Sequence, residues 1–115
     1  MKTLKTFAEF WPFYCREHRR PLTRRLHFVG SVLGPVASLA LFARTASGHA
    51  FWLWPLCGYG FAWAAHFFVE KNRPATFTYP FYSLISDYVM VWKMLAGKMD
   101  QEVSDAIRGQ KEAEA

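Results

Sequence analysis

The fold is decided by residues 45–69, TASGHAFWLWPLCGYGFAWAAHFFV, which contain no Asp, Glu, Lys or Arg. A second uncharged run, LHFVGSVLGPVASLALFA, occupies residues 26–43. A membrane-spanning helix needs roughly 20 apolar residues, with a range of about 17–25. The later run meets that length and the earlier run meets it marginally, so we predict two membrane helices, over residues 24–42 and 51–69. The competing interpretation is a soluble helical protein whose two core helices are unusually apolar.

Two further segments complete an all-α prediction. In residues 3–18 the aromatic and aliphatic side chains fall on one helical stripe, which favours an amphipathic helix on a membrane surface or against the bundle. Residues 81–95, FYSLISDYVMVWKML, resume an apolar helix with a polar stripe along one face. This second segment is either a third membrane helix or an interfacial helix.

Glycine spacing and composition set the packing and the domain limits. Gly30 and Gly34 form a pair of small residues four apart, which lets two helices approach closely in lipid. From residue 98 onward the chain turns polar and acidic, with no clear apolar stripe. We therefore predict one membrane-embedded domain over residues 1–98 and a loosely ordered, helical polar tail over residues 99–115.

The net charge of +5 is concentrated beside the first apolar run, because five arginines fall within residues 16–25. Basic residues that flank a membrane segment usually mark its cytoplasmic side and contact anionic lipid. No nucleic-acid-binding signature accompanies them, so we expect membrane lipid and no nucleic acid as a partner. Cys15 and Cys57 form no metal or disulfide pattern and are interpreted as small apolar side chains. We expect no cleavable signal peptide, because charges interrupt the amino-terminal apolar residues.

This topology brings four side chains with metal-ligand chemistry to one level. If the arginine-rich segment is cytoplasmic, His27 starts the first membrane helix on that side and His66 ends the second there. His18 lies in the arginine-rich segment itself, and Glu70 follows His66 by one helical turn. Each of them alone is weak evidence, since an interfacial histidine usually bonds only head groups or backbone, and Glu70 has basic neighbours. Together they predict a metal site, because ionisable groups at membrane depth cost roughly 3 kcal/mol each and are rarely kept without a function.

The residue types leave the metal and the reaction open. Neutral imidazoles with a carboxylate suit Fe(II), Zn(II) or another divalent transition metal. Three functions are compatible with such a site: a membrane oxygenase that uses iron, a membrane hydrolase that uses zinc-bound water, and a non-catalytic membrane adaptor or scaffold whose histidines are interfacial anchors. The sequence sets no oligomeric state.

Two stretches resemble a known family. FYCREHRRPLTRRLHFVG, residues 13–30, and GYGFAWAAHFFVEKNRPATFTYPFYSLISDYVMVW, residues 58–92, are similar to the small membrane proteins of the 2-hydroxy fatty acid dioxygenase family, formerly a domain of unknown function. The fungal member of that family acts in phytosphingosine breakdown. The present chain resembles a short, bacterial-type member, with Thr23 where the family often has Asn.

The resemblance implies an Fe(II)-dependent dioxygenase of fatty-acid α-oxidation. Together with the cytoplasmic placement of the arginine-rich segment, it leads us to expect a protein of the bacterial inner membrane with its metal site toward the cytoplasm. Such an enzyme cleaves C1–C2 of a 2-hydroxy fatty acid with O2 and releases a fatty acid one carbon shorter. On this reading Glu70 is a fourth ligand or orients a ligand, and Glu70 and Arg73 are catalytic. Substrate-binding candidates are Arg24, Arg73 and Asp87. The implied iron ligands are His18, His27 and His66.

Overall fold

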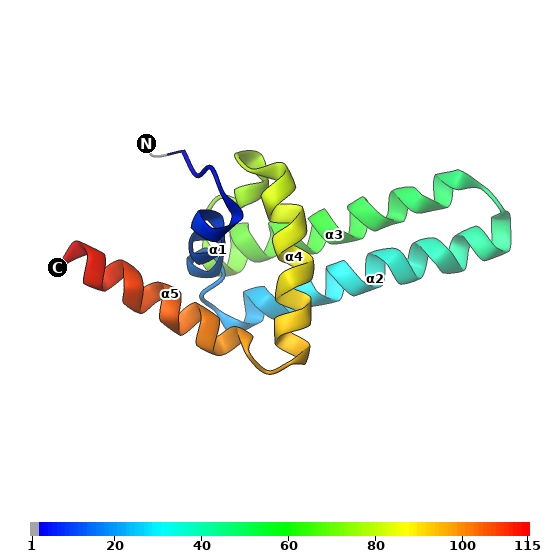
Figure 1. Ribbon diagram of the computed structural model, residues 1–115. Helices are drawn as coiled ribbons and strands as arrows, with labels where there is room; N and C mark the ends of the chain where they lie inside the picture. Colours follow the sequence, from blue (N-terminus) through cyan, green and yellow to red (C-terminus); the bar gives the residue numbers. More distant parts are fainter. Residues whose placement is uncertain (1–2) are drawn as a thin grey trace.

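Figure 1 shows the computed structural model, which describes residues 3–115. These residues form no strand, so the all-α prediction is confirmed. The helices are α1 (Phe7–Arg16), α2 (Pro21–Thr45), α3 (Leu53–Ala64), α4 (Pro80–Leu95) and α5 (Met99–Glu114). Three short turns join them: η1 (Gly48–Trp52), η2 (Ala65–Glu70), which is one turn of π-helix, and η3 (Ala75–Phe77).

Helices α2 and α3 form a long antiparallel hairpin that projects away from the other three helices (Figure 1). The predicted glycine pair makes this hairpin possible. A Cβ atom at Gly30 would lie 2.8 Å from the Cβ of Phe61, and one at Gly34 would lie 2.7 Å from the carbonyl oxygen of Trp54. Real Cβ atoms essentially never come this close, so the approach of α3 at these two positions of α2 requires glycine.

Of the two predicted membrane helices, one meets the length criterion as a single helix. With 25 residues, α2 is about 37 Å long and can cross a hydrocarbon layer of about 30 Å. It is the one helix within residues 3–115 that is long and apolar enough to do so. The second run instead forms η1, α3 and η2 in succession, and its α-helical part has only 12 residues. The change to π geometry at its end places His66, as described below.

The hairpin leaves many large apolar side chains uncovered. Val36 is 59% exposed on α2, Trp52 is 71% exposed before α3, and Phe68 is 77% exposed on η2. Exposed apolar surfaces of this extent are typical of membrane or protein contact surfaces, not of the water-facing side of a soluble domain.

The hydrophobic core lies at the base of the hairpin, where α1, α4 and α5 meet. Phe10 and Tyr14 of α1 pack there with Met90 of α4, and all three side chains are almost fully buried. Helix α4 has 16 residues, fewer than a span requires, and it crosses the base of the hairpin (Figure 1).

The segment predicted as a loosely ordered helical tail, residues 99–115, is helical as expected, but the helix is not loose. Residues 99–114 form α5, which packs against α1 and contributes Met99, Val103 and Ala106 to the core. These three residues fall at positions i, i+4 and i+7, which is one face of a helix. The face is narrow and includes an alanine, so the polar composition of the segment concealed it.

Candidate metal centre

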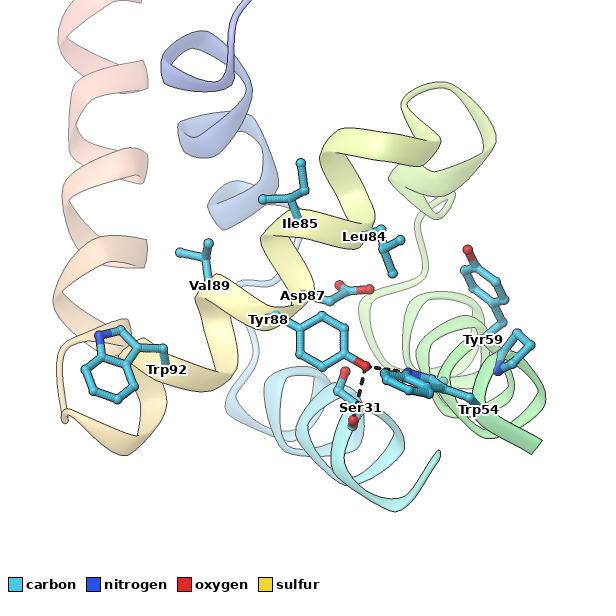
Figure 2. A pocket seen from close by; sticks show the side chains of 11 residues that line it. Ser31, Trp54, Tyr59, Leu84, Ile85, Asp87, Tyr88, Val89 and Trp92 are labelled. Carbon is cyan, nitrogen blue, oxygen red and sulfur yellow. Dashed lines mark hydrogen bonds between the residues drawn. The ribbon is translucent and has the colours of Figure 1, made fainter. Parts of the chain in front are cut away.

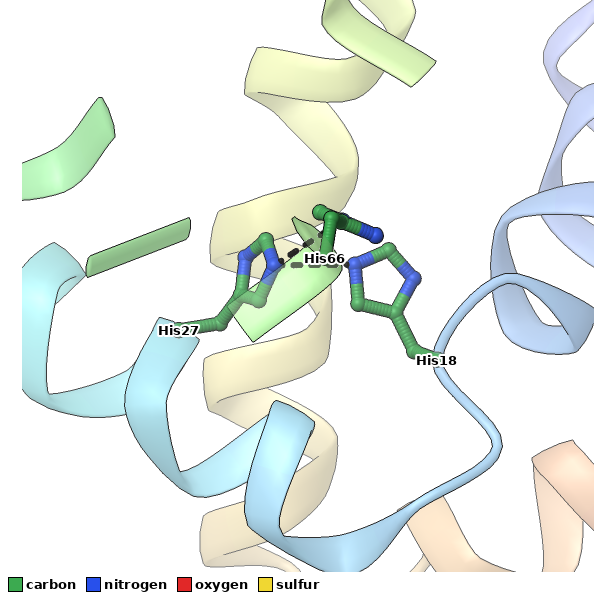
Figure 3. A group of neighbouring side chains, drawn as sticks. All are labelled: His18, His27 and His66. Carbon is green, nitrogen blue, oxygen red and sulfur yellow. Dashed lines mark hydrogen bonds between the residues drawn. The ribbon is translucent and has the colours of Figure 1, made fainter. Parts of the chain in front are cut away.

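Three histidines from three segments meet at the base of the hairpin (Figure 3). His18 lies in the loop between α1 and α2, His27 lies in the second turn of α2, and His66 lies in the π turn η2. The Nε2 atom of His27 is 3.1 Å from the Nε2 atoms of both His18 and His66. The three side chains are only 1%, 4% and 2% exposed, respectively. The structure therefore brings together the three histidines that the sequence placed on one side of the hairpin.

The opposite nitrogen of each ring faces an acceptor. His18 Nδ1 donates to the carbonyl oxygen of Tyr14 at 2.6 Å, and His66 Nδ1 donates to Asn72 Oδ1 at 2.7 Å. His27 Nδ1 lies 3.4 Å from Asp87 Oδ1. Carbonyl and carboxylate oxygens only accept hydrogen bonds, so the proton of each neutral ring belongs on Nδ1. The three Nε2 lone pairs then point at one another with no proton between them, which favours a shared cation.

The amide of Asn72 is fixed by a second pair of contacts. Its Nδ2 donates to the backbone oxygen of Glu17 at 3.1 Å and to Glu17 Oε2 at 2.9 Å. With the nitrogen engaged there, the amide oxygen must face His66. Lys71 has φ 60° and reverses the chain after η2, which brings Asn72 next to His66. The backbone N–H of Asn72 donates to the carbonyl oxygen of His66 at 3.0 Å.

Burial sets the protonation of the groups around His18. Burial, and then the neighbouring imidazoles of His27 and His66, hold the pKa of His18 well below its usual range, so the ring is neutral and able to bind a metal. Burial and the charge of Asp87 raise the pKa of Tyr14 well above its usual value. The Tyr14 phenol therefore stays protonated, and its O–H group donates a hydrogen bond to Asp87 Oδ1 at 2.5 Å. The Tyr14 ring also stacks on His18, with 4.0 Å between ring centroids.

The donor set fits a transition-metal ion. Imidazole nitrogens bind such ions at about 2.0–2.1 Å, so two nitrogens on one ion lie no more than about 4.2 Å apart. The His27–His18 and His27–His66 separations of 3.1 Å satisfy that limit, and all three ligand atoms lie within 4.8 Å of one another. Within residues 3–115 this is the one group of three or more His, Cys, Asp or Glu side chains placed to share an ion. Three imidazoles suit Fe(II) and Zn(II) alike and leave coordination positions for other molecules.

The family model described as 2-hydroxy-palmitic acid dioxygenase Mpo1-like matches residues 4–99 of the 115. The chain belongs to the Mpo1-like family. No curated protein and no solved structure matches it. The matched region holds all three histidines and ends where α5 begins, so the resemblance seen in the sequence is confirmed for the part of the chain that brings the three histidines together.

Glu70, the predicted fourth ligand of this Mpo1-like chain, lies outside the histidine group. Its carboxylate accepts hydrogen bonds from the backbone N–H groups of Arg19 and Arg20, at 3.3 and 2.6 Å, and from Thr23 Oγ1 at 2.7 Å. The first N–H groups of a helix have no partner within the helix, and a carboxylate stabilises that end. Glu70 therefore ties the end of η2 to the start of α2. The alternative role, orienting His66, falls to Asn72.

The two arginines predicted to bind substrate have other contacts. The Arg24 guanidinium is buried and donates to the carbonyl oxygens of His18 and Arg19, at 2.7 and 2.9 Å, and to Asp100 at 2.6 Å. It thereby holds the His18 loop against the start of α5. Arg73 is exposed, with its guanidinium 5.4 Å from the centroid of the Phe77 ring. Its role in catalysis or substrate binding stays a prediction.

Asp87, the third substrate-binding candidate, is placed beside His27 and Tyr14, on the outer side of the His27 ring. Sequence reasoning missed Asn72 and Glu17 altogether. Asn72 does stand in the quoted stretch of residues 58–92, six residues after His66. What could not be read from the sequence is the left-handed turn at Lys71, which reverses the chain and brings the amide under the ring.

Proposed function

We propose that this chain is an Fe(II)-dependent dioxygenase that cleaves the C1–C2 bond of a 2-hydroxy fatty acid. The observation that carries the proposal is the convergence of three imidazole Nε2 lone pairs, with every Nδ1 facing an acceptor. A donor set of this kind with open positions is suited to non-haem iron. The family description, which names a 2-hydroxy-palmitic acid dioxygenase, supports the class of substrate.

The proposed reaction converts the 2-hydroxy acid and one O2 into the acid one carbon shorter, carbon dioxide and water. C2 and C1 together lose the four electrons that reduce O2. Bound Fe(II) supplies the one-electron chemistry with which O2 and the substrate react. The residues of the chain orient the histidine ligands. Asn72 fixes the ring of His66 and Asp87 fixes the ring of His27, and the burial of all three histidine rings keeps bulk water away from the centre.

We further propose that the α2–α3 hairpin lies in the bacterial inner membrane, with the metal centre at the cytoplasmic interface. The uncovered apolar side chains of the hairpin support this placement. So do the five arginines of residues 16–25, which precede or begin α2 at the base of the hairpin. A fatty acid substrate is itself dissolved in that bilayer, so it can reach the centre without crossing water. Lipid and fatty acid are the proposed partners.

The test is anaerobic reconstitution of the detergent-purified protein with Fe(II), followed by O2 and 2-hydroxypalmitate. The proposal expects one O2 consumed for each pentadecanoic acid detected by mass spectrometry, and no product from His27→Ala protein. If no chain-shortened acid appears across a range of chain lengths, the dioxygenase proposal is wrong. Stoichiometric zinc without oxygen consumption would point to the hydrolase, and protein that binds no metal would point to the adaptor.

A further inference from the structure

A groove of about 830 Å³ runs between α4 and the α2–α3 hairpin (Figure 2). Its volume lies within the range of about 300–1,000 Å³ that is usual for small-molecule sites. Its lining includes Ser31 of α2, Trp54 and Gly58 of α3, and Leu84, Asp87, Tyr88 and Trp92 of α4.

The walls of this α3–α4 groove offer an apolar surface to a ligand. Where the groove does carry polar groups, most of them are already paired. Tyr88 Oη accepts from Trp54 Nε1 at 2.6 Å and donates to the carbonyl oxygen of Ser31 at 3.3 Å (Figure 2). Asp87 is the one charged residue in the lining. A sugar or a nucleotide would find few free partners here, whereas an alkyl chain needs none.

Asp87 places one end of the groove beside His27, on the Nδ1 side of that ring. The same carboxylate that faces the groove lies 3.4 Å from His27 Nδ1. The groove residues Gly58 and Trp54 precede His66 by 8 and 12 residues in the same helical segment. At 1.5 Å of rise per residue, they lie about 12 and 18 Å from His66 along the helix axis. Half of a hydrocarbon layer is about 15 Å thick. A chain whose acid group lies at the level of the histidines therefore has its tail within one leaflet along this groove.

We propose that the α3–α4 groove binds the alkyl chain of the 2-hydroxy fatty acid, with the acid end at the level of the histidines and the tail toward Trp54. This inference rests on the proposed function for the identity of the acid head. The occupant is a single unbranched chain. It enters sideways from the bilayer, because Trp54, Leu84 and Trp92 on the walls of the groove are 40%, 48% and 70% exposed. Gly58, at mid-length, leaves the groove open.

Glycine substitution gives a matched test. A Cβ atom at Gly58 or at Gly60 would meet nothing within 4 Å, so both positions accept a Cβ atom without a clash. Gly58 lines the groove, whereas Gly60 belongs to the same helix and does not line it. Gly58→Phe should therefore fill the groove, and Gly60→Phe is its control. Leu84→Trp plugs the groove from the opposite wall, in case Gly58→Phe does not fold.

The experiment uses full-length, Fe(II)-loaded protein in lipid nanodiscs with a 2-hydroxy fatty acid that carries a diazirine halfway along its chain. We expect photo-crosslinks in peptides of α3 and α4. Gly58→Phe and Leu84→Trp should lower them at least tenfold and raise KM for 2-hydroxypalmitate about tenfold, at unchanged metal content. Gly60→Phe should behave like the parent.

The outcomes separate the two proposals. Crosslinks in α3 and α4 without any oxygen consumption would retain the groove as an alkyl site and remove the dioxygenase proposal. Oxygen consumption with crosslinks only outside the groove, such as between α1 and α5, would overturn the groove. So would Gly58→Phe and Leu84→Trp proteins that fold, crosslink and turn over as the parent does. Equal displacement of the probe by ordinary phospholipid would show a lipid-filled surface and also overturn it.

Discussion

Removing the acceptor that orients His66 should weaken metal binding without touching a ligand. In Asn72→Leu the His66 Nδ1–H loses its 2.7 Å bond to the amide oxygen, and the ring is free to rotate. Changes in groups that orient metal ligands typically cost 10–100-fold in affinity. We therefore expect the metal dissociation constant to rise by that factor, or about 1.4–2.7 kcal/mol. Glu17 also loses both donors, which should cost about 1–3 kcal/mol of stability in the metal-free protein.

The assay is an anaerobic Fe(II) titration against a chelator of known affinity, with thermal unfolding of the metal-free protein in parallel. Asn72→Asp is the matched control, because it keeps an acceptor for His66 but loses the donors to Glu17. It should bind metal nearly as tightly as the parent while losing stability. If Asn72→Leu binds Fe(II) as the parent does, the reasoning that Asn72 fixes the His66 ring is refuted.

Three other predictions follow from the packing. Gly34→Ala should destabilise the hairpin by about 1–3 kcal/mol, because the added Cβ atom would clash with the backbone of Trp54. Thermal unfolding in detergent measures this loss. In the control Gly109→Ala the added Cβ atom meets nothing within 4 Å, so this variant should not be destabilised. Burial raises the pKa of the Cys15 thiol from 9.0 to about 12. In Cys57→Ser protein at pH 8, alkylation of Cys15 should therefore be about a thousandfold slower in the folded protein than after unfolding. Equal alkylation rates in the folded and unfolded protein would contradict the burial of Cys15. Val103→Asp should unfold the base or detach α5, seen as rapid proteolysis of the C-terminal segment, whereas a loose tail would show no change from the parent.

The sequence was sufficient for the parts of the site that depend on helix direction alone. Two antiparallel helices bring His27 and His66 to one end whatever their exact rotation, and His18 precedes the first by only nine residues. The close approach at Gly30 and Gly34 was likewise predictable, because small residues four apart lie on one helix face.

The remainder depended on geometry that residue types do not encode. Glu70 was predicted to bind the metal or to orient His66, but its carboxylate accepts from the N–H groups of Arg19 and Arg20, just before α2. Asn72 reaches His66 only because the chain reverses at Lys71. The α3–α4 groove exists only because α4 crosses the hairpin base, and crossing angles follow from packing across the whole molecule.

The central claim is that three histidines, and not Glu70, hold one metal ion. The most direct measurement is the iron-to-protein ratio after anaerobic loading with Fe(II) and removal of free metal. We predict one iron per chain in the parent and in Glu70→Ala, and almost none in His27→Ala. An absence of iron in the parent, or its loss in Glu70→Ala with retention in His27→Ala, would contradict the account.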